Sequence, residues 1–409
     1  PSVGISSANW DPIDWTGQLN TSGGDVMIWS GTGATNYLVA AGNASINAGS
    51  GNVTIRARDF NWIGMSALAI TTTGAIVIKP DNDSIVSFDR TINSSWFNLS
   101  GATPSSVQFG APSMTSGLII DSAINASGPI TVYGGTITVT GGLTTTSSSS
   151  GNISLTGTTV GGAGNISLAD NQTLTITQTG SSTYSGIISG TGASFVNAGT
   201  GTVILGGANT YSGTTTISAG TLVVGTNGLI NATSSITDNG TLTYLNGALN
   251  TATISGTGSV NVGSGSVTGT TLKLTGTLGV ATATVYSGNV LDLNGQTSTS
   301  GLSLSGTGIS NGGALTNSSS TAGTQSGGVT LTGATTIGGT GGITISGAIS
   351  GAYVVSFNAA GNLVLSGANA SLNLGGGSAT SVDIENTTSL EVSGALALSG
   401  ASKLLNSSV

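Results

Sequence analysis

A block of short apolar strands separated by turn residues occurs twice in this chain. Residues 182–209 read STYSGIISGTGASFVNAGTGTVILGGAN, and residues 343–369 read ITISGAISGAYVVSFNAAGNLVLSGAN. Such repetition is typical of proteins that stack similar supersecondary units, each of which buries a face that it could not bury alone. The sequence therefore predicts an array of stacked units, whose function is carried more readily by a surface than by a pocket.

The apolar residues follow the pattern of β-strands. Residues 136–140 (TITVT) and 173–177 (TLTIT) alternate between apolar and polar side chains, which is the period of a strand with one buried face. No stretch shows sustained helical periodicity, and no apolar run approaches the roughly 18–20 residues of a transmembrane helix. With 37% hydrophobic residues and only 5% charged residues, the chain also lacks the composition of a disordered protein. We expect an all-β fold.

The spacing of the strand cores predicts the size of one coil. Strand cores at 203–205, 222–224 and 242–245 recur at about 20 residues. If each coil adds about 4.8 Å, the chain forms an elongated rod of roughly 20 coils, on the order of 90–100 Å long. Asparagines beside Gly or Ala at strand edges are expected to form internal or turn ladders, because Asn tolerates left-handed backbone and hydrogen-bonds locally. These residues are Asn43, Asn152, Asn165, Asn209 and Asn369.

The stretch 195–225 carries a specific motif of glycines and apolar residues. Its positions are Gly199, Gly201, Val203, Leu205, Gly207, Asn209, Tyr211, Gly213, Thr215, Ile217, Gly220 and Leu222. The motif resembles the autotransporter-associated strand repeat of bacterial type V secreted proteins, with Asn197 where that family usually carries Lys. Residues 51–60, 128–157 and 164–177 are similar to the haemagglutinin-type repeats of large secreted adhesins.

The resemblance implies a fold and a location. The fold would be a right-handed parallel β-helix, or β-solenoid, and the location would be the extracellular space or the bacterial outer-membrane surface. Export would use an outer-membrane translocator outside this chain. The absence of Cys fits this route, since disulfides that form early in the oxidising periplasm would hinder passage through a narrow pore. The resemblance implies no known ligand.

Composition divides the chain at residue 121. All six prolines lie at or before Pro129 and all five tryptophans at or before Trp96. We therefore predict a less regular segment, rich in Trp and Pro, over 1–121, and a repetitive Gly/Thr/Ser-rich β-helix over 122–409 that includes the repeats at 182–225 and 343–369. Trp10, Trp15 and Trp29 would either cap the first coil or belong to the core of wider coils.

The sequence offers little for catalysis. It contains no His and no Cys, which excludes Ser-His-Asp and Cys-His catalysis and the usual zinc sites within this chain. Three carboxylate pairs remain, for which a solvated acidic face is the favoured interpretation. They are Asp11 with Asp14, Asp81 with Asp83, and Asp383 with Glu385; Glu391 repeats the pattern of the last pair. We expect no catalytic residue, no cofactor and no metal site.

Two other groups of residues could each bind a ligand, although a purely structural interpretation is favoured for both. Asp81 and Asp83 form a D-x-D turn similar to calcium ligands, but the positions that follow do not fit the calcium loop, so a metal-free turn is favoured. Arg56 and Arg58 share an outer strand face near Trp62. They could grip an acidic sugar, although a solvated patch with an Arg–Asp pair is the favoured interpretation.

The net charge of the chain and the unpaired strand edge at its C-terminal end indicate which partners it can bind. A net charge of −8 argues against nucleic acid. We expect a non-enzymatic structural or adhesive surface protein that contacts a host or neighbouring cell surface, a glycan or itself. The segment 396–409 carries one charge and no Pro or aromatic residue, so this edge would be covered either by further coils or by head-to-tail docking into a filament.

Two alternative functions stay open. One is a β-helix that binds or degrades polysaccharide. The other is a threonine array that binds ice, although its threonine triplets are irregularly spaced along the chain. These triplets are Thr136/Thr138/Thr140, Thr173/Thr175/Thr177, Thr251/Thr253 and Thr282/Thr284.

Overall fold

The structure is a computed structural model with side chains. It describes residues 2–6, 13–15, 17–29, 37–40, 44–57, 59–60, 67–80, 92–99, 101–112, 114–231, 234–245, 247–366, 372–374, 381–385, 390–392 and 403–406. These residues form strands, turns and two short 3-10 turns, η1 (Ser94–Trp96) and η2 (Ile309–Asn311), with no α-helix among them. Within the same residues, no helix has the length and apolar character needed to cross a membrane. The chain divides into two compact units, Pro1–Gly213 and Thr214–Val409.

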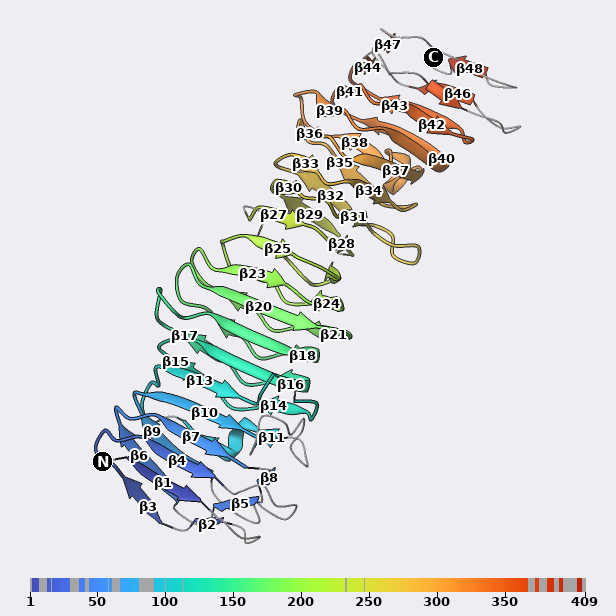
Figure 1. Cartoon of the computed structure of the whole chain (residues 1–409). Helices are drawn as coiled ribbons and strands as arrows, with labels where there is room; N and C mark the ends of the chain where they lie inside the picture. Colours follow the sequence, from blue (N-terminus) through green and yellow to red (C-terminus); the bar gives the residue numbers. More distant parts are fainter. Residues whose placement is uncertain are drawn as a thin grey trace. The chain divides into compact units, whose positions relative to one another are not determined.

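Parallel pairing between successive coils builds the first unit (Figure 1). Its longest ladder runs through β1 (Val3–Ser6), β4 (Val26–Trp29), β7 (Val53–Arg56), β10 (Ala75–Lys79), β13 (Ser106–Phe109), β16 (Ile130–Val139), β18 (Ile153–Gly162), β20 (Thr173–Gln178) and β23 (Ser194–Asn197). Each strand pairs with the strand one coil earlier and one coil later, which defines a β-solenoid. The all-β, parallel β-helical prediction is confirmed.

Other ladders close the coils of the first unit. One joins β11 (Ile92–Asn93), β14 (Leu118–Ile120), β16, β18, β21 (Ser181–Tyr184) and β24 (Thr202–Leu205). Another joins β15 (Ile124–Ala126), β17 (Leu143–Thr145), β19 (Ile166–Ser167) and β22 (Ile188–Ser189). The early coils contain two further ladders. One joins β2 (Ile13–Trp15), β5 (Tyr37–Ala40) and β8 (Asp59–Phe60). The other joins β3 (Gln18–Asn20), β6 (Ser45–Gly49), β9 (Leu68–Thr72) and β12 (Phe97–Asn98).

The second unit repeats this plan with three parallel ladders. The first contains β25 (Thr215–Ile217), β27 (Ile236–Asp238), β30 (Ile254–Ser255), β33 (Leu278–Gly279), β36 (Thr297–Ser298), β39 (Gly323–Gln325), β41 (Ile343–Ile345), β44 (Leu363–Leu365) and β47 (Leu390–Val392). The second contains β26 (Thr221–Val224), β28 (Thr241–Tyr244), β31 (Ser259–Val262), β34 (Thr282–Val285), β37 (Gly301–Gly306), β40 (Val329–Gly339), β42 (Ile349–Gly351) and β45 (Leu372–Leu374). The third contains β29 (Ala248–Thr251), β32 (Thr271–Leu274), β35 (Val290–Asp292), β38 (Leu315–Asn317), β40, β43 (Val355–Ala359), β46 (Ser381–Glu385) and β48 (Lys403–Asn406).

Coil length varies along the chain. The expected period of about 20 residues holds where Leu222 pairs with Leu242. It shortens to 18 residues between Ile236 and Ile254, and lengthens to 31 between Ile76 and Val107. A fixed period therefore describes only some of the coils, although the strands at both of these positions pair in register.

Inward side chains stack in columns and form the core. The column that continues from Val107 through Ile130, Ile153, Leu174 and Phe195 is almost fully buried. Every second residue of β13, β20 and β23 is buried in the same way. Backbone contacts between coils are equally close. A Cβ added at Gly201 would lie 2.1 Å from the carbonyl oxygen of Gly180, and one added at Gly361 would lie 2.4 Å from the nitrogen of Gly342. Glycine at these positions lets neighbouring coils approach.

Asparagine side chains extend the ladders beyond the strands. The N–H of Thr173 donates to Oδ1 of Asn152 at 2.8 Å, and the N–H of Ile187 donates to Oδ1 of Asn165 at 3.0 Å. Oδ1 of Asn209 likewise accepts the N–H of Ile188 at 2.9 Å. Each of these three side chains therefore hydrogen-bonds the backbone of a neighbouring coil, and Asn209 also bonds the carbonyl oxygen of Gly207 within its own turn. Asn43 and Asn369 lie outside the described residues.

Candidate functional site

The carboxylate pairs expected from the sequence are only partly placed. Asp11, Asp81 and Asp83 lie outside the described residues, and Asp14 lies in β2. Asp383 and Glu385 alternate with Ile384 along β46, where their backbone pairs with Ser356 and Asn358 of β43; Glu391 lies in β47. Among the residues searched, which are those that the structure describes, no group of three or more His, Cys, Asp or Glu side chains could hold a metal ion.

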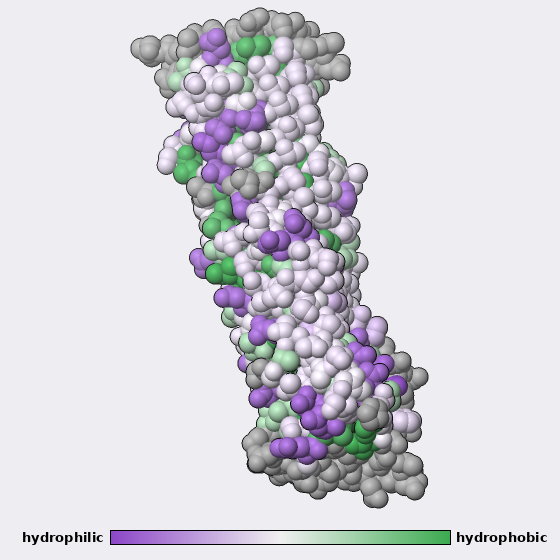
Figure 2. Space-filling model, turned by 90° about the vertical axis from the view of Figure 1, so that its left-hand side faces the viewer, coloured by the Kyte–Doolittle hydropathy of each residue, from purple (hydrophilic) through white to green (hydrophobic). Residues whose placement is uncertain are grey.

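The threonine triplets do not form one continuous array. Thr138 pairs with Gly161 of the next coil, and Thr175 pairs with Ser154 of the preceding coil. The triplets at 136–140 and 173–177 therefore do not stack on each other. Figure 2 shows a face on which most of the coloured surface is near white, as Gly, Ser and Thr side chains give, with purple and green residues scattered over it.

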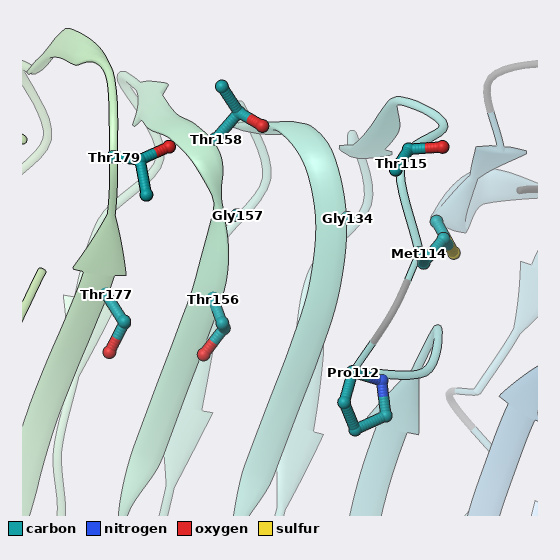
Figure 3. A pocket seen from close by; sticks show the side chains of 9 residues that line it. All are labelled: Pro112, Met114, Thr115, Gly134, Thr156, Gly157, Thr158, Thr177 and Thr179. Atoms are coloured by element: carbon teal, nitrogen blue, oxygen red, sulfur yellow. The ribbon is translucent and has the colours of Figure 1, made fainter. Parts of the chain in front are cut away.

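A small groove opens on the first unit beside β16, β18 and β20 (Figure 3). Its volume is about 280 Å³, and it is lined by Pro112, Met114, Thr115, Gly134, Thr156, Gly157, Thr158, Thr177 and Thr179. Thr156 and Thr177 pair in register and their side chains lie next to each other, while Met114 approaches from the opposite side. A Cβ at Gly157 would lie 2.5 Å from the carbonyl oxygen of Gly134. The floor is therefore backbone, and the walls offer hydroxyl groups, a thioether and no titratable group.

A second, more polar cup lies farther along the same unit. It encloses about 460 Å³ and is lined by Ser167, Leu168, Asp170, Ser189, Gly190, Thr191, Thr210 and Ser212. Ser167 and Ser189 pair in register on β19 and β22. The N–H of Gly192 donates to Oγ of Ser212 at 2.7 Å, which fixes that side of the rim. Hydroxyl groups beside the single carboxylate of Asp170 are suited to hydrogen-bonding a polyhydroxylated ligand, since both accept O–H donors.

Two buried carboxylates were not anticipated from the sequence. Asp292 is 5% exposed; its Oδ1 accepts the N–H groups of Asn294 and Ser318, and its Oδ2 accepts the hydroxyl of Ser318 at 2.6 Å. Asp238 is fully buried, and its Oδ1 accepts the N–H of Gly240 at 3.0 Å. Its Oδ2 has no hydrogen-bond partner within the described part of the chain.

Burial changes the protonation of Asp238. It raises the pKa of this carboxyl from 3.8 to about 6, against the opposing effect of the N–H groups of Gly240 and Leu242, which favour the ionised form. Burial also raises the pKa of the neighbouring Tyr244, whose hydroxyl lies 3.3 Å from Oγ1 of Thr251. In the sequence, Asp238 stands in the polar string Thr237-Asp238-Asn239-Gly240, which is typical of an exposed turn. Only the register with Ile217 shows that it faces the core.

The residues of the repeat motif at 195–225 make close contacts or tight turns in both units. In the first, the buried rings of Phe195 and Tyr211 pack with centroids 6.3 Å apart, and Nδ2 of Asn209 donates to the carbonyl oxygen of Gly207 at 3.0 Å. A Cβ at Gly207 would lie 2.3 Å from the carbonyl oxygen of Gly186. In the second, Gly220 adopts a φ of 64°, a left-handed conformation that suits glycine. The motif therefore specifies close stacking of coils.

Comparison with protein families gives one match. Residues 195–224 match the Passenger-associated-transport-repeat family, which confirms the resemblance of this segment. A search of curated proteins and a search of solved structures found no match. The family match and the β-solenoid together fit an autotransporter passenger and point to a surface or extracellular location.

Proposed function

We propose that the chain is a non-enzymatic structural or adhesive part of an autotransporter passenger, which attaches the bacterium to a host or neighbouring cell through glycans. The observation that carries the proposal is the passenger repeat at 195–224 within a stack of parallel coils. A passenger is exported and displayed, and a stack of coils presents its turns and outer strand faces to the surroundings.

The described surface supports binding better than bond cleavage. Hydrolysis of a glycosidic bond ordinarily uses two carboxyl groups on opposite sides of the bond. The polar cup offers hydroxyl groups and the carboxylate of Asp170, and the groove of Figure 3 offers hydroxyl groups and the thioether of Met114. Short hydroxylated side chains lose little conformational entropy on contact, so rows of them suit a weak, repeated interaction with sugars.

Cell-surface display tests this function. The chain would be fused to an outer-membrane translocator in a non-adhesive bacterium, with the translocator alone as the control. We expect protease-accessible surface exposure and retention on glycan-coated or cell-coated surfaces, both absent from the control. Surface exposure without retention on any glycan or cell would contradict the adhesive role.

Two further measurements separate the alternatives. Incubation with pectin, alginate or glycosaminoglycan should release no reducing ends; release that is lost in Asp170→Asn would instead support a polysaccharide-degrading enzyme. Electron microscopy of the purified chain should show whether it remains as single particles or assembles into filaments, and filaments would add self-association to the mode of attachment.

A further inference from the structure

We propose that the polar cup of the first unit binds one neutral hexose unit of a glycan, with the carboxylate of Asp170 accepting hydrogen bonds from two of its hydroxyl groups. This inference deepens the proposed adhesive function, on which it rests for its biological meaning, by naming a site and a class of sugar. The cup encloses about 460 Å³, which lies within the range of small-molecule sites.

Three successive coils supply the polar side chains of the cup. Ser167 of β19 pairs in register with Ser189 of β22. Thr210 lies on the next coil, where its N–H donates to the carbonyl oxygen of Ile188 at 2.9 Å. Because neighbouring coils lie about 4.8 Å apart, their hydroxyl groups can bond to different hydroxyl groups of one pyranose ring.

The repeat motif holds one side of the cup in place. Thr210 and Ser212 are exposed and alternate with Asn209 and Tyr211, which are buried. Oγ of Ser212 accepts the N–H of Gly192 at 2.7 Å, and its O–H remains available as a donor. The inward positions of the motif therefore fix the coil, while the outward positions present hydroxyl groups.

A tight turn places Asp170 at the rim of the cup. The turn is closed by a hydrogen bond from the N–H of Gln172 to the carbonyl oxygen of Ala169, at 3.2 Å. It is attached to the next coil, because the N–H of Asn171 donates to the carbonyl oxygen of Thr191 at 2.9 Å. A carboxylate that the backbone has already positioned binds a ligand with a smaller loss of conformational entropy.

Several side chains of the cup contribute nothing to holding the coils together. Within the described part of the chain, four of them form no hydrogen bond or ion pair with the protein: those of Ser167, Asp170, Thr191 and Thr210. Each of these groups keeps its full hydrogen-bonding capacity for a molecule outside the protein.

The second unit contains a corner with the same backbone contact. A Cβ added at Gly190 would lie 2.7 Å from the carbonyl oxygen of Leu168, and one added at Gly351 would lie 2.5 Å from the carbonyl oxygen of Leu331. In both cases the glycine follows a strand that pairs in register with the strand before the leucine. The two corners can therefore be compared residue by residue.

The corner of the second unit lacks two of the polar side chains. Asp170 stands two residues after the leucine of the first corner, and Gly333 stands at that place in the second. Thr191 follows the glycine of the first corner, and Ala352 follows that of the second. The backbone forms this corner without a carboxylate or a hydroxyl group at these places, so the polar groups of the first corner are not required by the fold, which favours a role in binding.

The chemistry of the cup matches a neutral sugar. A carboxylate accepts hydrogen bonds from two adjacent O–H groups, and the hydroxyl groups of Ser and Thr both donate and accept. The charge of Asp170 and the net charge of −8 disfavour a carboxylated or sulfated sugar. A calcium ion fits less well, because it takes about six to eight oxygen ligands and the cup offers a single carboxylate.

Binding to one cup should be weak. Among the described residues that line it, none is aromatic, so no ring stacks on the sugar. We expect a dissociation constant on the order of 1 mM. Many copies of the chain on one cell would strengthen attachment through multivalency.

Saturation-transfer NMR with the purified full chain tests the site. The probes are the methyl glycosides of glucose, galactose and mannose, each compared with the uronide that differs from it only by a carboxylate at C6. They are titrated to about 20 mM, well above the expected dissociation constant. We expect saturable binding of at least one neutral glycoside, and at least about tenfold weaker binding of its uronide.

Variants locate the binding in the cup. Asp170→Asn should lower the affinity at least about tenfold and reduce the preference for the hexose over its uronide, while the thermal unfolding temperature stays that of the wild type. Thr191→Ala should lower the affinity about threefold. Thr282→Ala removes an exposed hydroxyl group from β34 in the second unit; it is the matched control and should bind as the wild type does.

Several outcomes would overturn the proposal. They are no saturable binding of any of the three neutral glycosides, wild-type affinity in Asp170→Asn, or binding of the uronide as tight as that of the hexose. Binding of calcium that is lost in Asp170→Asn, without any binding of sugar, would reassign the cup to a cation.

The displayed chain separates this site from the proposed function. Cells that adhere equally with and without Asp170→Asn would retain the adhesive function and reject the site. Binding of the sugar in solution without any cell adhesion would retain the site and reject the function.

Discussion

The interiors of the two units accommodate buried polar side chains differently. In the first unit, the buried polar residues that the structure describes are neutral, and Gln178 is an example. Its Oε1 accepts the N–H of Val160 and the hydroxyl of Ser182, both at 2.8 Å, and its Nε2 donates to the carbonyl oxygen of Thr202. In the second unit, the corresponding part of the core includes the carboxylates of Asp238 and Asp292.

The two buried carboxylates differ in the number of hydrogen-bond donors around them, and this number decides how easily each can stay ionised in the core. Asp292 receives three hydrogen bonds from Asn294 and Ser318. Asp238 leaves one oxygen without a partner within the described residues, and a proton is the simplest way to neutralise it. No carboxylate is buried in the described core of the first unit. The stability of the second unit should therefore depend on pH near 6, and that of the first should not.

The largest loss of stability should come from removing a buried phenylalanine, of which each unit has an example. Phe195→Ala and Phe357→Ala each remove a fully buried ring and should lower the free energy of unfolding by about 3–5 kcal/mol. Because coils interact with their nearest neighbours, faster hydrogen exchange should stay within the unit that carries the substitution. Peptide-resolved exchange of the full chain measures this, and equal loss of protection in both units after either substitution would show that they unfold together.

A smaller effect should follow from closing the space between coils. Gly201→Ala and Gly361→Ala place a methyl group against the backbone of the preceding coil and should each cost about 1–3 kcal/mol. Gly265→Ala is the control, since nothing lies within 4 Å of its added Cβ. Urea unfolding followed by hydrogen exchange compares the three. An unchanged free energy of unfolding in Gly201→Ala would mean that neighbouring coils can move apart without loss of stability.

The pH dependence tests the difference between the units directly. The folded pKa of Asp238 is raised to about 6 from 3.8, so the folded unit holds this proton more tightly than the unfolded chain does. The stabilisation is complete below about pH 4 and is lost as the pH rises through about 6. The shift corresponds to at most about 3 kcal/mol.

Asp238→Asn should flatten this dependence. Hydrogen exchange measured at several pH values, corrected for intrinsic rates, should show protection of the second unit falling between pH 4 and pH 7 in the wild type and much less in the variant. The first unit serves as the internal control. A slope of equal size in both units, or one that survives the substitution, would contradict the assignment to Asp238.

The smallest effect should come from the asparagine ladders. Asn152→Ala in the first unit and Asn239→Ala in the second each remove a hydrogen bond to the backbone of a neighbouring coil, at Thr173 and Thr257 respectively. Both sites are exposed, so water replaces part of the bond, and we expect a loss of about 0.5–1 kcal/mol in each. Thermal unfolding compares them. A loss above about 2 kcal/mol would mean that the ladders, rather than the apolar columns, hold the coils together.

The sequence predicted the class of fold but not which residues of neighbouring coils lie side by side on its surfaces. Alternation in TITVT and TLTIT indicates strands because the side-chain period is a local property. Coil length is not local, since it depends on how many residues each turn absorbs. The sequence grouped Arg56 with Arg58 and Trp62, which lie outside the described residues, and it could not show that the residues paired in register with Arg56 are Trp29 and Lys79.

The boundary in composition at residue 121 differs from the boundary between the compact units, which falls after Gly213. Within the segment 396–409, the described residues are those of β48, and head-to-tail docking at that edge stays a prediction. Handedness and adhesion likewise stay inferences from the resemblance of 195–224, because that segment constrains coil stacking and carries no information about a ligand.

Variable coil length has a consequence for how such a gene can change. A coil of 31 residues between Ile76 and Val107 adjoins one of 23 between Val107 and Ile130, and the paired strands stay in register across both. An insertion in a turn therefore lengthens a single coil and leaves the apolar columns intact. Selection can act on the exposed turns almost independently of the core, so a lineage can diversify the outer surface of the coils without first rebuilding the scaffold that displays it.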